Sequence, residues 1–329
     1  MEKKIAIIGA GISGLAVAEH LKNISSIEIF EKSRGIGGRM STRYTDNFQF
    51  DHGAQFFTAR SKSFIDFLKP FIKRDIVKEW LPKIVTLESG EKPYKREWFE
   101  THYTAAPKMN MLCKTIAAKH NVYLKVEITS MSQEPIGWFL IDSKNERHGP
   151  FDWVISSAPA PQTAKLLSSH FKHHDDISAI KMQGCYSLMI GLSDDLNVKW
   201  DAVKVKNSSI EWIAVNSSKP LCDTGYSLLI QTSNEWAQAH IDDDQDVVKE
   251  LLLTETETLL QNSIGNAHYI SLHRWRYANT VIGSDQESQM HFLDEINNLA
   301  ACGDWCIKGS VESAYLSALS LAEALKKHL

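Results

Sequence analysis

The sequence predicts an α/β fold in which a Rossmann-like domain, made of a parallel sheet and a β-meander, is joined to a second α+β domain built on an antiparallel sheet. Three observations support this prediction. The chain has 329 residues, enough for about two domains. A glycine-rich turn between an apolar strand and a helix stands near its N-terminus. Alternating strand-like segments fill much of its second half.

Composition places the chain among ordinary globular proteins. Hydrophobic residues make up 43% and charged residues 23%, which excludes a mainly disordered, collagen-like or coiled-coil chain. The formal charge of −4 gives no strong attraction to nucleic acid or to an anionic membrane. Five cysteines are few and odd in number, which indicates a reducing compartment. We therefore expect a cytoplasmic protein with no nucleic-acid partner and no membrane partner.

The first expected element is a buried apolar strand that runs into the pattern G-x-G-x-x-G. Gly9 permits the tight turn, Gly11 lets a diphosphate approach the backbone, and Gly14 lets the following helix pack closely on the sheet. The helix begins with free N–H groups that can face phosphate oxygens. A secretory signal has a similar outline, but three glycines would weaken its helix. The predicted cofactor contacts of this turn are Gly9, Gly11, Ile12, Ser13 and Gly14.

A second strand over 27–30 ends at Glu31, 22 residues after Gly9. A βαβ unit places an acid at this distance beside a ribose diol of a bound dinucleotide. The carboxylate disfavours a 2′-phosphate, and so disfavours an NADP-type ligand at this site. The strand, the glycines, the helix and the acid together predict a dinucleotide site, and they leave open whether the dinucleotide contains flavin or nicotinamide.

The residues after this strand favour a flavin. Residues 31–40 (EKSRGIGGRM) resemble the E-x-x-x-x-x-G-G-R segment of the FAD-dependent amine-oxidase superfamily. A flavin ring lies beyond the diphosphate and needs a close approach of backbone, which Gly37 and Gly38 allow. Arg39 can give planar, bidentate contacts to phosphate oxygens. An NAD dehydrogenase has no need for these three residues.

Later segments narrow the resemblance to the bacterial renalase-like flavoproteins. Residues 51–60 (DHGAQFFTAR) are similar to the family's G-A-Q-[YF]-F-T-A-R segment. Residues 302–317 are similar to its C-G-D-W-C…V-E-x-A-x-L-S block. Residues 154–162 (VISSAPAPQ) resemble its crossing between domains, and residues 273–278 (HRWRYA) resemble its substrate region. Segments from nearly the whole chain therefore agree in order.

The resemblance implies a bound FAD and the residues that contact it. The sequence gives no firm sign of covalent attachment, so we expect the FAD to be bound non-covalently. Asp304 would bind ribityl hydroxyls, and the helix that begins near Val311 would point its positive end at the flavin ring. Val126 would lie beside the adenine. The chain has Ser310, Ser313 and Ala318 where the family has an arginine and two glycines. The further predicted FAD contacts are Glu31, Lys32, Gly38, Arg39, Met40, Gly53, Ala54, Gln55, Phe56, Val126, Ala158, Gly303, Asp304 and Val311.

The resemblance also implies a reaction. Renalase-like enzymes take hydride from off-pathway dihydronicotinamides, which carry it at ring position 2 or 6, and pass electrons to O2 to give H2O2 and NAD(P)+. Such a donor needs no strong general base, because the lone pair of the ring nitrogen expels the hydride. An oxidase of small amines, a flavin-binding protein without turnover and an NAD-binding dehydrogenase remain alternatives. The residues expected to shape the pocket are Gln55, Phe57, Trp275 and Tyr277, with Arg274 and Arg276 as contacts to substrate phosphates.

We expect the FAD-binding domain to be discontinuous, with residues 1–60, 105–165 and 290–329, and the substrate domain to take residues 61–104 and 166–289. In the first domain the sequence predicts a helix over 109–119 and a meander whose strands are 122–128, 138–142 and 153–156. In the second it predicts a helix over 245–260 and strands over 186–192, 211–215, 226–232 and 267–275.

No metal site is predicted. Cys302 and Cys306 are four residues apart, with no other zinc ligand in their segment. The histidines within 170–174 stand in a charged stretch that is typical of a solvated loop. Three aspartates at 242–244 lack the glycine and the distal glutamate of a calcium loop, so they are interpreted as the flank of a helix.

Overall fold

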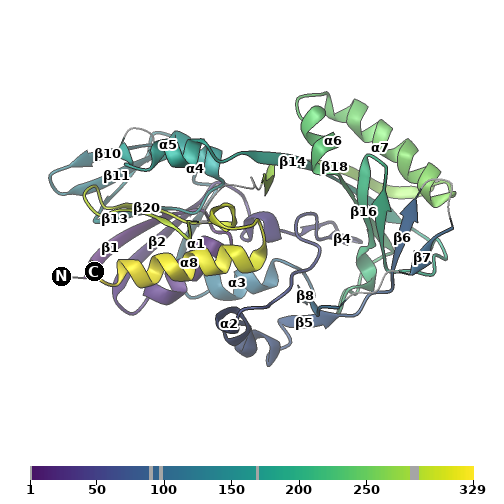
Figure 1. The fold of residues 1–329 in the computed structure, drawn as a ribbon, viewed down its shortest axis with the longest axis horizontal. Coiled ribbons are helices and arrows are strands. Elements are labelled where there is room, and N and C mark those ends of the chain that lie inside the picture. Colours follow the sequence, from purple (N-terminus) through teal and green to yellow (C-terminus); the bar gives the residue numbers. More distant parts are fainter. Residues whose placement is uncertain (1, 89–91, 96–98, 168–169, 282–288) are drawn as a thin grey trace.

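The chain forms two lobes that share one interface (Figure 1). One lobe contains a mostly parallel sheet and both ends of the chain, and the other contains a mostly antiparallel sheet. The strands β14 (Met182–Leu192) and β18 (Ala267–Thr280) lead from the first lobe into the second. This computed structural model describes residues 2–88, 92–95, 99–167, 170–281 and 289–329.

The first lobe is built on a six-stranded sheet whose strand pairs are parallel except for the edge pair β19–β20. Ile8 lies beside both Ser156 and Phe30, so the carboxyl ends of three central strands meet at one edge. Ligands of open α/β sheets bind at this edge. In spatial order the strands are β19 (Phe292–Asp294), β20 (Leu299–Ala301), β13 (Trp153–Ser156), β1 (Lys3–Ile8), β2 (Ser25–Glu31) and β9 (Asn121–Leu124).

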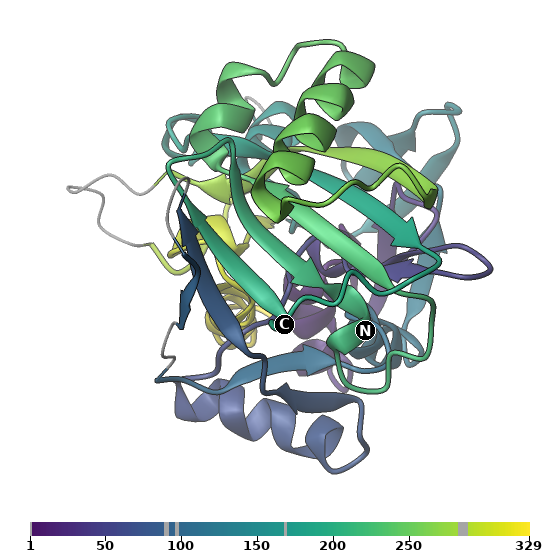
Figure 2. The same cartoon turned by 90° about the vertical axis from the view of Figure 1, so that its right-hand side faces the viewer.

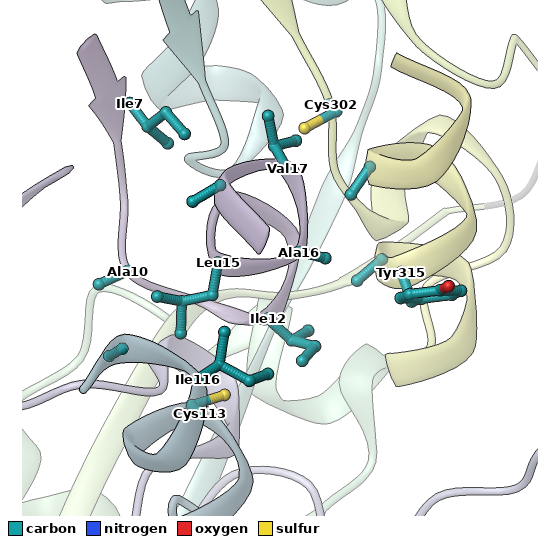
Figure 3. Packing of buried hydrophobic residues seen from close by; sticks show 14 of the residues in the cluster. Ile7, Ala10, Ile12, Leu15, Ala16, Val17, Cys113, Ile116, Cys302 and Tyr315 are labelled. Atoms are coloured by element: carbon teal, nitrogen blue, oxygen red, sulfur yellow. The ribbon is translucent and has the colours of Figure 1, made fainter. Parts of the chain in front are cut away.

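Apolar side chains on both faces of β1 bury this sheet between two layers. Ile5 and Ile7 face α1 (Ile12–Leu21), α3 (Met111–Ala117) and α8 (Val311–Leu325). In Figure 3, α1 lies between the other two helices, with Leu15 near Ile116 on one side and Tyr315 on the other. Ala6 and Ile8 face the opposite layer, which contains α4 (Ala160–Leu167), α5 (His174–Ser178), β10 (Ile128–Glu134), β11 (Gly137–Asp142) and β12 (Arg147–Phe151).

The predicted meander was partly wrong. Its strands are β10, β11 and β12, whereas the segments expected at 122–128 and 153–156 supply β9 and β13 of the parallel sheet. All four residues of β13 are buried, as in a strand covered on both faces. Strand patterning shows that a segment is extended, but it does not show which strand it pairs with.

The second lobe is built on a seven-stranded sheet in which the pair β15–β6 is parallel and the other pairs are antiparallel. The four strands predicted here and the helix over 245–260 are confirmed. Figure 2 looks onto the sheet and the two helices packed against it, α6 (Asn234–Ala239) and α7 (Gln245–Leu260). The other strands are β17 (Ser227–Thr232), β16 (Ile210–Val215), β15 (Ala202–Lys206), β6 (Ile84–Glu88) and β7 (Tyr94–Lys95).

The segment 61–104 contributes to both lobes. The helix α2 (Lys62–Ile72) packs with α8 in the core of the first lobe, while β6 and β7 extend the second sheet. Between them, β5 (Val77–Trp80) pairs with β8 (His102–Ala105). A short hairpin of β3 (Arg43–Tyr44) and β4 (Gln49–Phe50) packs against the second sheet. Within the described ranges, every helix is too short or too polar to cross a membrane.

A candidate active-site cavity between the two sheets

A cavity of about 1480 Å³ is lined both by the carboxyl edge of the parallel sheet and by the antiparallel sheet. Its volume exceeds the roughly 300–1,000 Å³ of ordinary small-molecule pockets. The cavity therefore has room for a dinucleotide together with a second ligand.

The predicted cofactor contacts gather along this cavity, with one exception. The exception is Gly14, which is buried behind it, where a Cβ atom would lie 2.3 Å from the carbonyl oxygen of Gly9 and 2.6 Å from Ser157 Oγ. Gly14 therefore serves the packing of α1 on the sheet, as expected. The predicted contacts that line the cavity are Gly9, Gly11, Ile12, Ser13, Glu31, Lys32, Gly38, Arg39, Met40, Gly53, Ala54, Gln55, Phe56, Val126, Ala158, Gly303, Asp304 and Val311.

Gly11 and Gly38 form an open cradle at the start of α1. A Cβ atom built on Gly11 would meet nothing within 4 Å, so the space in front of this residue is empty. Gly11 forms a β-bridge with Gly37, and a Cβ atom on Gly38 would lie 3.4 Å from Gly11 Cα. The helix α1 begins without a side-chain cap and without an acid in its first turn. The cradle can therefore receive an anionic group beside the positive end of a helix.

Backbone groups fix the carboxylate of Glu31 at the end of β2. Its Oε2 accepts a hydrogen bond from Ala10 N at 2.9 Å, and its Oε1 accepts one from Ser33 N at 2.7 Å. The carbonyl oxygen of Glu31 accepts a hydrogen bond from Val126 N at 3.0 Å. Glu31 and Val126, predicted at the ribose and the adenine, therefore lie together at one end of the cavity.

Arg39 and Asp304 bind each other. Arg39 Nη1 donates to Asp304 Oδ2 at 2.8 Å and to the carbonyl oxygen of Ala278 at 3.0 Å, while Nη2 pairs with Asp304 Oδ1. We expected Arg39 at phosphate oxygens and Asp304 at ribityl hydroxyls. The structure instead joins them in a bidentate pair that connects the short helices η1 (Gly38–Met40) and η4 (Asp304–Cys306) to β18.

Three strands of the antiparallel sheet hold the cavity segment that contains Gly53. Trp275 Nε1 and Ser187 Oγ donate to the carbonyl oxygen of His52 at 2.8 and 2.7 Å. Gln231 Nε2 donates to the carbonyl oxygen of Gly53 at 2.8 Å. The indole N–H of Trp275 is thus used in fixing this backbone, and its ring remains the part that can face a substrate.

The predicted pocket residues of β18 are two aromatic residues and two arginines, which have different partners. The aromatic residues Trp275 and Tyr277 alternate with two arginines, and all four line the cavity. Arg274 Nη1 donates to the carbonyl oxygen of Ile241 at 2.9 Å, and Arg276 Nη2 lies 2.8 Å from Asp242 Oδ1. Both guanidinium groups, expected at substrate phosphates, therefore bind the segment that joins α6 to α7.

Phe57 does not line the cavity, which corrects its expected role in shaping the pocket. It is 4% exposed and belongs to the core of the first lobe. Its ring lies 6.0 Å from the rings of Phe64 and Tyr103, and its backbone forms a β-bridge with Tyr103. Its neighbour Phe56 faces the cavity instead, because successive side chains of an extended segment point to opposite sides.

Two histidines that were not predicted as site residues lie beside Trp275. The ring of His52 stacks on Trp275 with centroids 5.2 Å apart and meets the ring of His273 edge-on at 4.9 Å. Burial, with the charges of His273 and Arg43, lowers the pKa of His52 to about 3. Burial and the charge of Arg43 lower the pKa of His273 to about 4. Both imidazoles are neutral at pH 7. Strand alternation, which puts His273 on the face of Trp275, could have identified it.

The cysteines and histidines considered as metal ligands have other surroundings. Cys302 and Cys306 are buried free thiols, and burial raises the pKa of Cys302 to about 12. His173 bonds Asp176 and the carbonyl oxygen of Leu293. Within the part of the chain that the structure describes, one group has its potential ligand atoms within reach of a shared ion: Asp142, Glu146 and His148, at the meander.

Comparison with known families decides the class of the protein. The profile of the family described as flavin containing amine oxidoreductase matches residues 94–326, and that of the NAD(P)-binding Rossmann-like domain matches residues 7–71. The chain belongs to the flavin-containing amine oxidoreductase family. It is therefore a flavin-dependent oxidoreductase, and the cavity is its candidate active site.

Individual relatives agree with this membership. The chain is similar to renalase of Mus musculus, with 23% identity over 353 residues that cover 99% of both chains. A 4,4′-diapophytoene desaturase of Staphylococcus aureus is 38% identical over 77 residues, which are 20% of this chain and 15% of the desaturase.

Two solved structures show that the fold is that of flavin oxidoreductases. One is a protein assigned as a protoporphyrinogen oxidase from Exiguobacterium sp. 255-15, with a TM-score of 0.81, 11% identity and full coverage of both chains. The other is putrescine oxidase bound to putrescine, with a TM-score of 0.73, 13% identity and 99% coverage of both chains. The predicted α/β fold is confirmed.

Side chains of the cavity fit a flavin. Four of its lining residues carry a buried polar atom that lacks a hydrogen-bond partner among the described residues. Such atoms are unfavourable unless a ligand or a water molecule forms a hydrogen bond with them. They include donors and acceptors, as the polar edge of a flavin requires. The atoms are His52 Nδ1, Gln55 Oε1, Asn110 Oδ1 and Trp212 Nε1.

Proposed function

We propose that the chain binds FAD without a covalent link and oxidises dihydronicotinamide dinucleotides that carry the hydride at ring position 2 or 6. The products would be NAD(P)+ and, with O2 as electron acceptor, H2O2. The open cradle at Gly11 and Gly38, with Glu31 fixed at the end of β2, is the observation that carries the cofactor assignment. The similarity to renalase over 99% of the chain supports the substrate assignment.

Different residues along the cavity would bind different parts of FAD. The cradle and the start of α1 would hold the diphosphate, and Glu31 would bind the adenosine ribose. The pair of Arg39 and Asp304 lies where the ribityl chain would pass, and Val311 opens the helix whose positive end would face the flavin ring. When bound, FAD supplies the hydride acceptor and the later reaction with O2.

The chemistry of the cavity thiol supports a non-covalent cofactor. Cys185 of β14 is the cysteine that lines the cavity among the described residues. Burial raises the pKa of its thiol to about 12. Because the thiolate is the nucleophilic form, this cysteine is poorly suited to attack a flavin. We therefore expect the cofactor to leave the protein on denaturation.

The cavity contains little to act as a general base near its histidines. Asp304 is bound by Arg39, and Glu211 by Lys204. His52 and His273, with pKa values of about 3 and 4, are weak bases at pH 7. An ammonium substrate must lose a proton before its oxidation, whereas a dihydronicotinamide loses hydride without one. The cavity therefore suits a dihydronicotinamide better than an amine.

An assay with two substrate panels tests this proposal. The purified protein is denatured to identify the released flavin, and H2O2 is measured with the 2-, 4- and 6-isomers of dihydroNAD(P) and with a panel of small amines. We expect released FAD and H2O2 from the 2- or 6-isomer. H2O2 from amines alone, or a colourless protein, would contradict the proposal.

A further inference from the structure

The half-buried guanidinium of Arg43 in the cavity is held by a neutral hydroxyl. Arg43 of β3 lines the cavity, and its Nη1 donates to Ser271 Oγ at 3.2 Å. Among the residues that the structure describes, no Asp or Glu lies within ion-pair distance of Arg43. Two other arginines of the cavity pair with a carboxylate, Arg39 with Asp304 and Arg276 with Asp242, and Arg274 donates to the carbonyl oxygen of Ile241.

Arg43 and Arg39 contact β18 at different points along the strand. Arg39, next to Gly38, contacts the carbonyl oxygen of Ala278, whereas Arg43 contacts Ser271, seven residues earlier on β18. At the rise of a strand, these two contacts are roughly 20 Å apart. Arg43 therefore contacts β18 well away from the point where the Arg39–Asp304 pair contacts it. Its charge acts on His52 and His273, whose rings lie against Trp275 of the predicted pocket.

Among the described residues, the titratable groups next to Arg43 supply no negative charge. The groups near it are His52 and His273, and its charge contributes to the lowered pKa of both. The described lining of the cavity has eight Lys and Arg against four Asp and Glu, in a chain whose formal charge is −4. A partly buried charge without a partner is unfavourable. The unneutralised guanidinium of Arg43 indicates that this part of the cavity binds an anion.

We infer that Arg43, with its guanidinium held by Ser271, is a specificity-determining residue that binds a phosphate of the dinucleotide substrate. The inference rests on the proposed function, because it names how that substrate is recognised. A guanidinium suits the task because its planar fork matches phosphate oxygens in a bidentate contact. The same residue would repel a protonated amine.

Two substrates, a riboside without phosphate and a dinucleotide with two, test the inference. Wild type and Arg43→Gln are assayed with 2- or 6-dihydronicotinamide riboside, which has no phosphate, and with the dihydroNAD of the same isomer. We expect the KM for the dinucleotide to rise about tenfold in the variant, because one charge-assisted contact is lost. The KM for the riboside and the kcat for both should change less than twofold. Arg43→Lys keeps the charge but not the planar fork, so its KM for the dinucleotide should rise two- to fivefold.

Further variants separate this inference from a general effect of charge. Arg147→Gln removes a cation of the meander that is paired with Glu134 outside the cavity, and it should leave the KM for the dinucleotide within twofold of wild type. Equal losses with riboside and dinucleotide, loss of flavin from Arg43→Gln, or a phosphate-dependent loss in Arg276→Gln alone would overturn the inference. Failure of wild type to oxidise either substrate would contradict the proposed function itself.

Discussion

At the scale of single residues, two glycines of one motif have different neighbours. Gly11 faces empty space, whereas Gly14 lies against Gly9 and Ser157. The motif alone predicts both roles, since one glycine admits a ligand and the other admits a helix. Arg43 and His52 have no such signature, because their roles depend on which side chains surround them.

Alanine substitutions of these glycines should affect different properties, flavin binding for Gly11 and folding stability for Gly14. Gly11→Ala places a methyl group in the cradle, so it should lower the flavin content of the purified protein while the free energy of unfolding without flavin changes by less than about 1 kcal/mol. Gly14→Ala forces overlap with backbone, so it should destabilise the fold by about 1–3 kcal/mol or more. Absorbance of bound flavin and urea denaturation measure the two effects. Full flavin occupancy in Gly11→Ala would contradict the position of the diphosphate.

The buried His52 makes stability depend on pH. Its pKa of about 3 lies below the value of about 6.5 in an unfolded chain, so the unfolded state binds the proton first as the pH falls. This group therefore lowers the free energy of unfolding of wild type by about 2 kcal/mol between about pH 7 and about pH 5. His52→Gln lacks this loss. Urea denaturation at the two pH values should show the difference, and parallel pH profiles of the two proteins would contradict it.

At the scale of elements, a fully buried ion pair positions the cavity segment that follows β4. Lys219 Nζ lies 3.0 Å from Asp51 Oδ2, just after the short helix η3 (Asn216–Ser218). The other oxygen of Asp51 accepts hydrogen bonds from Thr42 Oγ1 at 2.6 Å and from Met109 N at 3.0 Å. One carboxylate thus ties the β3–β4 hairpin to the approach to α3 and to the second lobe.

Removing one partner of this pair should be costly. Lys219→Met leaves the Asp51 carboxylate buried without its cation, so we expect a loss of about 3–5 kcal/mol in the free energy of unfolding. The double variant Lys219→Met with Asp51→Asn leaves no such charge and should lose less than the single variant. Chemical denaturation of the holoprotein measures both. A double variant that is less stable than the single one would show that the pair does not act as described.

The sequence predicted elements best where the signal is local. Asp244 accepts hydrogen bonds from Asp246 N and Val247 N and caps α7, as its place before the helix suggests. Ser310, which replaces an arginine of the renalase-like family, caps α8 through Ser313 N. The partners of β9 and β13 were not predictable in this way, because pairing between distant strands depends on the whole sheet.

At the scale of the whole molecule, the cavity exists only because distant segments meet. The cradle and Glu31 come from the N-terminus, Asp304 from the C-terminus, and Trp275 from the second lobe. Their order along the chain identified them, because each belongs to a recognisable motif. The destinations of Arg274 and Arg276 were not predictable, since the sequence does not show that the segment between α6 and α7 covers that side of β18.

Anaerobic mixing of the flavin-loaded protein with separate 2-, 4- and 6-isomers of dihydroNAD tests the central claim most directly. The absorbance of the oxidised flavin reports hydride transfer without any contribution from O2. We predict fast bleaching by the 2- or 6-isomer and slow bleaching, or none, by the 4-isomer. Fast bleaching by the 4-isomer alone would contradict the proposed function.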